Sequence, residues 1–218
     1  MSMLWILYAS VLGFAVAAIF AGFLKLSRNI YLLIYIPLIA VLVTLFIITN
    51  RISVTEVLLH NWYWGLLGAL IAGAFVIKNV FSQPSSKRSS GFPLFIDIFW
   101  SGLTYGLIDA LLLSILPILA IQLAFTDSAW TENLLGKIGI STIGLLASFL
   151  VTTAYHLGYP EFRSKKVIWP NVGNGVLSLA FILTMNPLAA IIPHMAMHVT
   201  AMIHGKDTTG QVPPHYND

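Results

Sequence analysis

The chain has 218 residues, of which 58% are apolar and only 9% are charged. A soluble domain of this size needs more charged surface, so the composition excludes a soluble globular protein and indicates an all-α, polytopic membrane protein. The formal charge of +3 is too small to indicate nucleic-acid binding. The absence of cysteine excludes disulfides, iron–sulfur clusters and thiolate zinc sites.

Seven apolar stretches follow one another, near residues 3–24, 30–49, 60–77, 95–124, 134–157, 169–185 and 187–204. At about 1.5 Å per residue, the first five are long enough to cross about 30 Å of hydrocarbon. The last two are marginal and could instead form a hairpin within the membrane. We therefore predict one transmembrane domain, residues 1–218, built as a bundle of about seven helices, six at the least. The first is predicted to be retained, because no basic segment of a signal peptide precedes it.

Lysine and arginine are distributed unevenly over the loops between these spans. Because basic residues collect in cytoplasmic loops, the sequence favours an outside N-terminus and a cytoplasmic C-terminus. In that arrangement nine of the eleven basic residues lie inside: Lys25, Arg28, Lys78, Lys87, Arg88, Arg163, Lys165, Lys166 and Lys206. Only Arg51 and Lys137 remain on the outer side.

Two polar stretches stand out from the apolar sequence. Residues 79–92 combine serine, proline and glycine with the adjacent Lys87 and Arg88, so we predict a flexible cytoplasmic loop. Residues 205–218 are predicted to form a short polar C-terminal tail. Asn186 and Pro187 predict a tight outer turn between the last two spans.

Small residues recur at every fourth position in two of the spans: Gly13, Ala17 and Ala21 in the first, and Gly65, Ala69 and Gly73 in the third. Such faces allow helices to approach one another closely in a membrane. The pattern predicts close helix contacts, either within the chain or with a second copy in a homo-oligomer. The other expected partners are membrane lipids.

Polar side chains form a stripe on each of the fourth and fifth spans. They occur at helical spacing as Asp97, Ser101, Tyr105 and Asp109, and as Lys137, Ser141, Ser148, Thr152 and His156. Because polar groups are costly in hydrocarbon, the two stripes are expected to face a shared interior. A carboxylate near mid-membrane must be paired, protonated or metal-bound, which makes Asp109 a candidate catalytic residue.

The segment after the fifth span holds one acid and three bases, Glu161, Arg163, Lys165 and Lys166. Its simplest interpretation is a cytoplasmic loop with a positive-inside cluster. Alternatively, Arg163 could bind a lipid headgroup or a phosphate, since a guanidinium suits such oxygens. Lys137, at the outer end of the fifth span, is a second candidate for contact with substrate or headgroup.

The last span carries His194 and His198, which are four residues apart and therefore lie on one helix face. Assuming that this helix ends near His204, they lie about 15 Å and 9 Å from its inner end, close to the depth expected for Asp109. His156, at the inner end of the fifth span, is a candidate third imidazole. This set predicts a zinc site, or a ferrous iron site of two histidines and one carboxylate.

The H-x-x-x-H pair and the earlier aspartate resemble the seven-helix intramembrane zinc hydrolases that include alkaline ceramidases and adiponectin receptors. In that family the third histidine and the aspartate come from the second and third helices, whereas Asp109 falls on the fourth, so the resemblance ends at the last helix. Intramembrane prenyl proteases use paired glutamates, whereas Glu161 is solitary. Membrane desaturases need more histidines than the six present. The sequence therefore identifies no family.

Three hypotheses follow. In the first, the protein is an intramembrane metal-dependent enzyme acting on a lipid or prenyl substrate, with metal on the histidines and Asp109 binding the metal or activating water. In the second, Asp109, Lys137 and the histidines form the titratable path of a small proton-coupled carrier. In the third, the protein is a structural or haem-binding subunit of a membrane complex, and in the haem-binding version His156 or His204 pairs with His198 to hold a haem.

Overall fold

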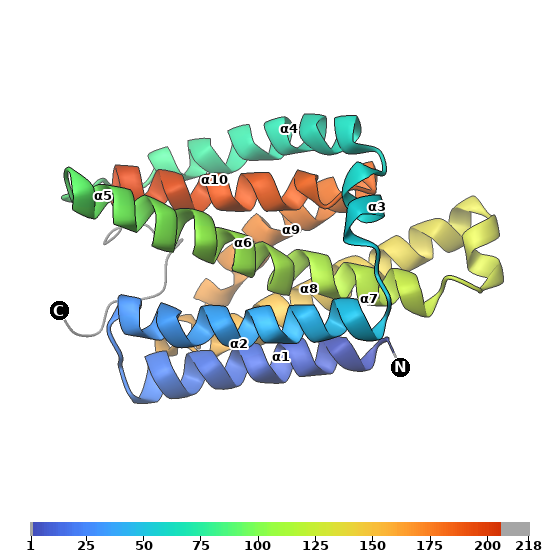
Figure 1. The fold of residues 1–218 in the computed structure, drawn as a ribbon, viewed down its shortest axis with the longest axis horizontal. Coiled ribbons are helices and arrows are strands. Elements are labelled where there is room, and N and C mark those ends of the chain that lie inside the picture. Colours follow the sequence, from blue (N-terminus) through green and yellow to red (C-terminus); the bar gives the residue numbers. More distant parts are fainter. Residues whose placement is uncertain (1, 206–218) are drawn as a thin grey trace.

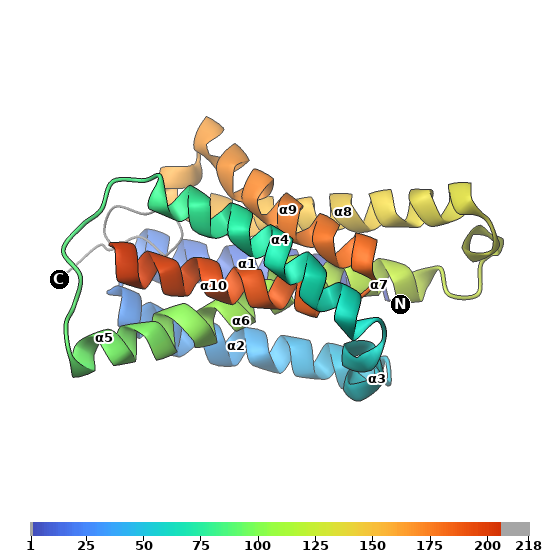
Figure 2. The same cartoon turned by 90° about the horizontal axis from the view of Figure 1, so that it is seen from above.

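The computed structural model describes residues 2–205, which form helices and no β-strand. Most of the long helices run close to one common axis, with α4 and α10 along one side of the bundle and α1 and α2 along the other (Figure 1). Seen from above, α9 is tilted and α4 crosses over α10 (Figure 2). The predicted all-α helical bundle is confirmed.

The helices agree closely with the predicted spans. In chain order they are α1 (Leu4–Val16), continued by the π-helical η1 (Ala17–Phe23), α2 (Arg28–Thr49), α3 (Val54–Leu59), α4 (Trp62–Phe81), α5 (Phe92–Asp97), η2 (Ile98–Thr104), α6 (Tyr105–Ala110), η3 (Leu111–Ile115), α7 (Leu116–Ala124), α8 (Leu134–Leu157), α9 (Ile168–Thr184) and α10 (Leu188–His204). Short 3₁₀ turns, η4 (Ala129–Glu132), η5 (Pro160–Phe162) and η6 (Lys165–Val167), lie in the loops.

Six of the described helices are long and apolar enough to cross a membrane, and α10 is a seventh apolar helix of 17 residues. This agrees with the predicted range of six to seven. The turn before α10 is tight, as Asn186-Pro187 predicts, because α9 ends at Thr184 and α10 begins at Leu188. The loop predicted at 79–92 begins later than expected, since α4 continues to Phe81. Of the predicted tail, residues 206–218 lie outside the described residues.

The segment from α5 to α7 forms one continuous helix through the middle of the bundle (Figure 1). In its most apolar window 67% of the residues are buried, whereas no other candidate span exceeds 39%. Two π-helical stretches, η2 and η3, flank the short α6 that carries Asp109. Such interruptions are common at functional sites because they change which side chains share a face.

The predicted small-residue faces are used inside the chain. A β-carbon on Gly13 would lie 3.5 Å from Leu112 on η3 and 3.6 Å from Tyr155 on α8, and one on Gly65 would overlap the side chain of Asn186. Ala17 and Ala21 are also fully covered. These contacts account for both stripes without a second copy, and the homo-oligomer stays a prediction.

Ser148 and Thr152 of the predicted α8 stripe join a buried hydrogen-bonded cluster beside the central helix. Its members are Ser114, Ser148, Thr152, Asn174 and Ser178. The Asn174 amide donates to Ser148 Oγ at 2.9 Å and to Thr152 Oγ1 at 2.8 Å, and its carbonyl accepts from Ser114 Oγ at 2.7 Å. Because these groups satisfy one another, the cluster serves to hold α8, α9 and η3 together.

Replacing Asn174 by alanine should therefore destabilise the bundle. We expect a loss of about 1.5 kcal/mol in unfolding free energy, since three buried hydroxyls lose a partner. Asn171 on the same helix is only half-buried and makes a single hydrogen-bonded side-chain pair with Thr153, so Asn171→Ala should cost about 0.5 kcal/mol. Unfolding by detergent titration measures both, and equal effects would contradict a special role for Asn174.

Candidate metal centre

Glycines on the central helix bring it close to α10. A β-carbon on Gly106 would lie 2.8 Å from the Cα of Met195 and 3.1 Å from the imidazole of His198. One turn earlier, a β-carbon on Gly102 would lie 2.9 Å from the side chain of Val199. The Gly102-x-x-x-Gly106 pair thus forms a small-residue contact face on which α10 lies, and this places its histidines beside α6.

Three buried side chains meet at this contact. The Nε2 atoms of His194 and His198 lie 3.9 Å and 3.8 Å from the same oxygen of Asp109, Oδ2. The exposed fractions of the three residues are 3%, 2% and 3% for His194, His198 and Asp109. The two imidazoles are stacked, with ring centroids 5.2 Å apart. The expected pairing of Asp109 with the histidines of the last helix is therefore present.

The arrangement fits a metal ion better than it fits direct hydrogen bonds. Distances of 3.8–3.9 Å are too long for N–H···O bonds. Two ligands that are each about 2.0–2.1 Å from one tetrahedral ion lie about 3.3–3.4 Å apart, so each of these pairs would close by about 0.5 Å on binding. One ligand atom from each residue can be chosen so that all three lie within 4.8 Å of one another.

The other ring nitrogen of His194 shows how its imidazole is held. His194 Nδ1 is buried and makes no hydrogen bond within the described residues. A neutral imidazole that binds metal through Nε2 carries its proton on Nδ1. The ring is thus oriented by the packing of α10 rather than by a hydrogen-bond partner, and its Nε2 faces the carboxylate.

A tyrosine fixes the carboxylate from the opposite side. Tyr35 on α2 donates its hydroxyl hydrogen bond to Asp109 Oδ1 at 2.5 Å and is itself fully buried. One carboxylate oxygen is therefore held by α2, while the other faces the two imidazoles. Carboxylates that bind metals are commonly oriented by a hydrogen-bond donor of this kind. Tyr35 had no distinguishing signal in the sequence, because nothing there pairs α2 with the central helix.

Further tyrosines surround this site. The hydroxyl of Tyr155 lies 2.9 Å from that of Tyr105 and 3.3 Å from that of Tyr31. The hydroxyl of Tyr159 lies 2.6 Å from that of Tyr155 and 2.7 Å from that of Tyr31. The Tyr105 ring also packs edge-on against the imidazole of His198, with centroids 4.7 Å apart. The buried hydroxyls extend from beside the Asp109 site to the 158–167 end of the bundle.

His156 does not belong to the group, contrary to the prediction of a third imidazole ligand. Among residues 2–205, the possible metal-binding group consists of Asp109, His194 and His198. His156 Nδ1 instead makes a 2.8 Å hydrogen bond with the backbone carbonyl of Thr152, one turn earlier on α8. Its ring packs edge-on against Phe162. Helical spacing placed His156 on the polar stripe, but its side chain folds back onto its own helix.

The haem arrangement also lacks its second ligand. Bis-histidine haem requires another imidazole to face His198 across the porphyrin. His204 Nε2 lies 2.7 Å from the backbone carbonyl of Gln83, and its ring packs on Phe81. His156 is bonded to its own helix, so both histidines that were predicted to pair with His198, His156 and His204, have other partners.

Arg163 and Lys137 do not belong to the group of Asp109, His194 and His198. The guanidinium of Arg163 donates to the carbonyl oxygens of Leu157 and Gly158, at 3.1 Å and 3.2 Å. It therefore caps the C-terminal end of α8, where a cation is favoured. Lys137 is exposed near the start of α8. Contact of either residue with a substrate or headgroup stays a prediction.

The acid at the other end of the predicted stripe also has a local role. Asp97 accepts a 2.7 Å hydrogen bond from Ser89 Oγ and so ties the end of α5 to the loop before it.

Comparison with family models, curated proteins and solved structures finds no match for this chain. The functional argument therefore rests on the geometry of the site.

Proposed function

We propose that this protein is an intramembrane metal-dependent hydrolase that acts on a membrane lipid or prenyl compound. The observation that carries the proposal is the convergence of Asp109, His194 and His198, all buried, with both imidazoles directed at one carboxylate oxygen. Ionisable groups in the interior of a membrane bundle are functional by default, because they are costly to keep there. Two imidazoles and a carboxylate are the ligand set of many catalytic zinc sites.

In this proposal His194 and His198 hold the ion through Nε2, and Asp109 Oδ2 completes the set or receives a proton from water. A bound zinc ion would supply a water of lowered pKa in its open coordination position. Tyr35 keeps the carboxylate in place by donating to Oδ1. The reaction class is hydrolysis of an ester, amide or phosphoester bond. One product takes the hydroxyl group of the water, and the other takes its proton.

The position of the site supports a substrate from the bilayer. Asp109 lies near the middle of the continuous helix Phe92–Ala124, and the histidines lie well inside α10. The orientation that we propose has the N-terminus outside and the C-terminus in the cytoplasm. It is supported because the turn before α2, the loop after α4, the 158–167 segment and the end of α10 all lie at one end of the bundle (Figure 1).

The direct test is metal content. Detergent-purified wild type should carry about one zinc or iron per chain, and the His194→Ala/His198→Ala variant should carry none, because two of the three ligands are removed. His60→Ala is the matched control, since His60 is exposed and its Nε2 lies near the Asn61 amide. Elemental analysis measures all three. Wild type without metal would overturn the proposal, and iron in place of zinc would redirect it to oxidation chemistry.

One observation favours a proton-coupled carrier as the second candidate. The hydroxyls of Tyr31, Tyr155 and Tyr159 lie within hydrogen-bond distance of one another, and that of Tyr105 joins them through Tyr155. Such a network can pass protons between a buried carboxylate and one end of the protein. The two candidates differ in whether the Asp109 group binds a metal, and this distinction is tested below.

A further inference from the structure

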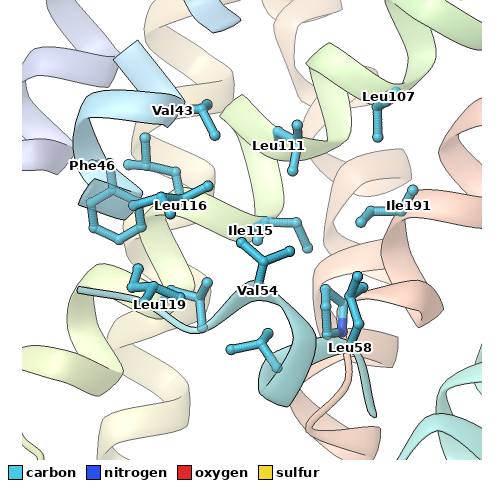
Figure 3. Close-up of a pocket in the computed structure, with 14 residues that line it drawn as sticks. Val43, Phe46, Val54, Leu58, Leu107, Leu111, Ile115, Leu116, Leu119 and Ile191 are labelled. Carbon is cyan, nitrogen blue, oxygen red and sulfur yellow. The ribbon is translucent and has the colours of Figure 1, made fainter. Parts of the chain in front are cut away.

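A cavity of about 260 Å³ lies between α2, α3, the central helix and α10. All 14 residues that line it are apolar (Figure 3). Phe46 comes from α2, Leu111 and Ile115 from η3, and Val54 and Leu58 from α3. An apolar cavity of about 150 Å³ in a protein core is enough to bind benzene. This one is larger and offers no polar partner to water or to a charged ligand.

The cavity and the group of Asp109, His194 and His198 lie on different faces of the central helix. The cavity lining includes Leu107, two residues before Asp109, and Leu111, two residues after it. Residues two apart on a helix point to opposite sides, so both leucines turn away from the carboxylate. None of the three residues of the group lines the cavity. The close-up shows Leu107, Leu111 and Ile191 at one side of the cavity and Val54 and Leu58 on the α3 side (Figure 3).

The short helix α3 borders the cavity. No residue of α3 is buried, although Val54 and Leu58 line the cavity. The amide of Asn186 donates to the carbonyl of Leu58 at 2.9 Å and to that of His60, just after the helix, at 2.6 Å. Asn186 is fully buried in the turn before α10. This side chain therefore ties the C-terminal end of α3 to that turn.

We propose that this cavity binds one hydrocarbon chain of a membrane lipid. The wall chemistry supports a purely hydrocarbon occupant, and the volume suits a segment of one chain rather than a whole lipid. The inference goes beyond the proposed function and does not rest on it, because Asp109, His194 and His198 do not line the cavity.

The test uses photo-crosslinking in phosphatidylcholine nanodiscs that contain a phosphatidylcholine with a diazirine in one acyl chain. In wild type, cross-links should map to η3 and α3 and should be competed by the same lipid without the diazirine. Leu111→Trp should lower this cavity labelling at least about tenfold, because the indole occupies the space that the chain needs. Leu70→Trp is the matched control, since Leu70 is 72% exposed on α4 and should leave cavity labelling unchanged.

The outcomes separate this inference from the proposed function. Cavity labelling that survives in His194→Ala/His198→Ala supports chain binding whether or not metal is present. Labelling confined to exposed positions such as Leu70, with none on η3 or α3 of the wild type, overturns the inference even if the protein carries zinc. The wild-type map gives this answer without relying on the fold of Leu111→Trp.

Discussion

Replacing Asp109 by asparagine is expected to lower zinc affinity by at least about 100-fold. Loss of a group that only hydrogen-bonds to a metal ligand typically costs about 10–100-fold, and a larger effect is expected where Asp109 itself completes the ligand set. Asparagine retains the volume of the side chain and a carbonyl oxygen that can still accept from Tyr35. The fold should therefore persist while the anionic ligand opposite His194 and His198 is lost. Competition of the purified protein with a zinc chelator measures the change.

Tyr35→Phe provides the graded comparison for this experiment. It removes only the hydroxyl that holds Asp109 Oδ1, so we expect a weaker effect of about 10–100-fold. Equal zinc affinity in wild type and Asp109→Asn would contradict the proposed ligand set. If the wild type binds no metal and Asp109→Asn stops the pH-driven movement of a solute in vesicles, the carrier becomes the better description.

The helices were predictable because hydropathy and length alone determine what can cross a bilayer. The pairing of His194 with His198 was also predictable, since a helix places residues four apart on one face. The proximity of these histidines to Asp109 was predicted only from similar depth along two separate helices. Depth is a weaker constraint than helical spacing, because it does not say which helices are neighbours. The group forms because Gly106 allows close approach, and no local pattern reveals which helix a glycine will face.

The errors have equally local causes. His156 has the spacing of a ligand, but its Nδ1 bonds to the Thr152 carbonyl of its own helix and its ring packs on Phe162. Tyr35 was missed because a buried tyrosine in an apolar helix resembles ordinary packing until its partner is known. The cavity depends on side chains from four helices, so its volume is a property of tertiary packing. Sequence patterns identify candidates within one helix, whereas the site depends on contacts between helices.

Gly106→Ala should reduce metal affinity by about tenfold or more, although the mutated residue binds nothing itself. The new β-carbon would lie 2.8 Å from the Cα of Met195, which belongs to the backbone of α10 and cannot rotate aside. The helix must therefore shift by several tenths of an ångström, and both imidazoles shift with it. Because ligands have to hold positions within about 0.5 Å, the shift separates them from Asp109. Zinc titration of the purified variant measures the loss.

Gly173→Ala on α9 is the matched control, since a β-carbon there meets nothing within 4 Å. Helix propensity alone would make both substitutions stabilising by up to about 1 kcal/mol. The two variants should therefore differ in sign, with Gly173→Ala at least as stable as wild type and fully metal-loaded. A Gly106→Ala protein with unchanged zinc affinity would mean that the position of α10 does not set the ligand geometry. Loss of affinity with a retained helical spectrum would instead show that the small residue at position 106 acts by positioning the histidines.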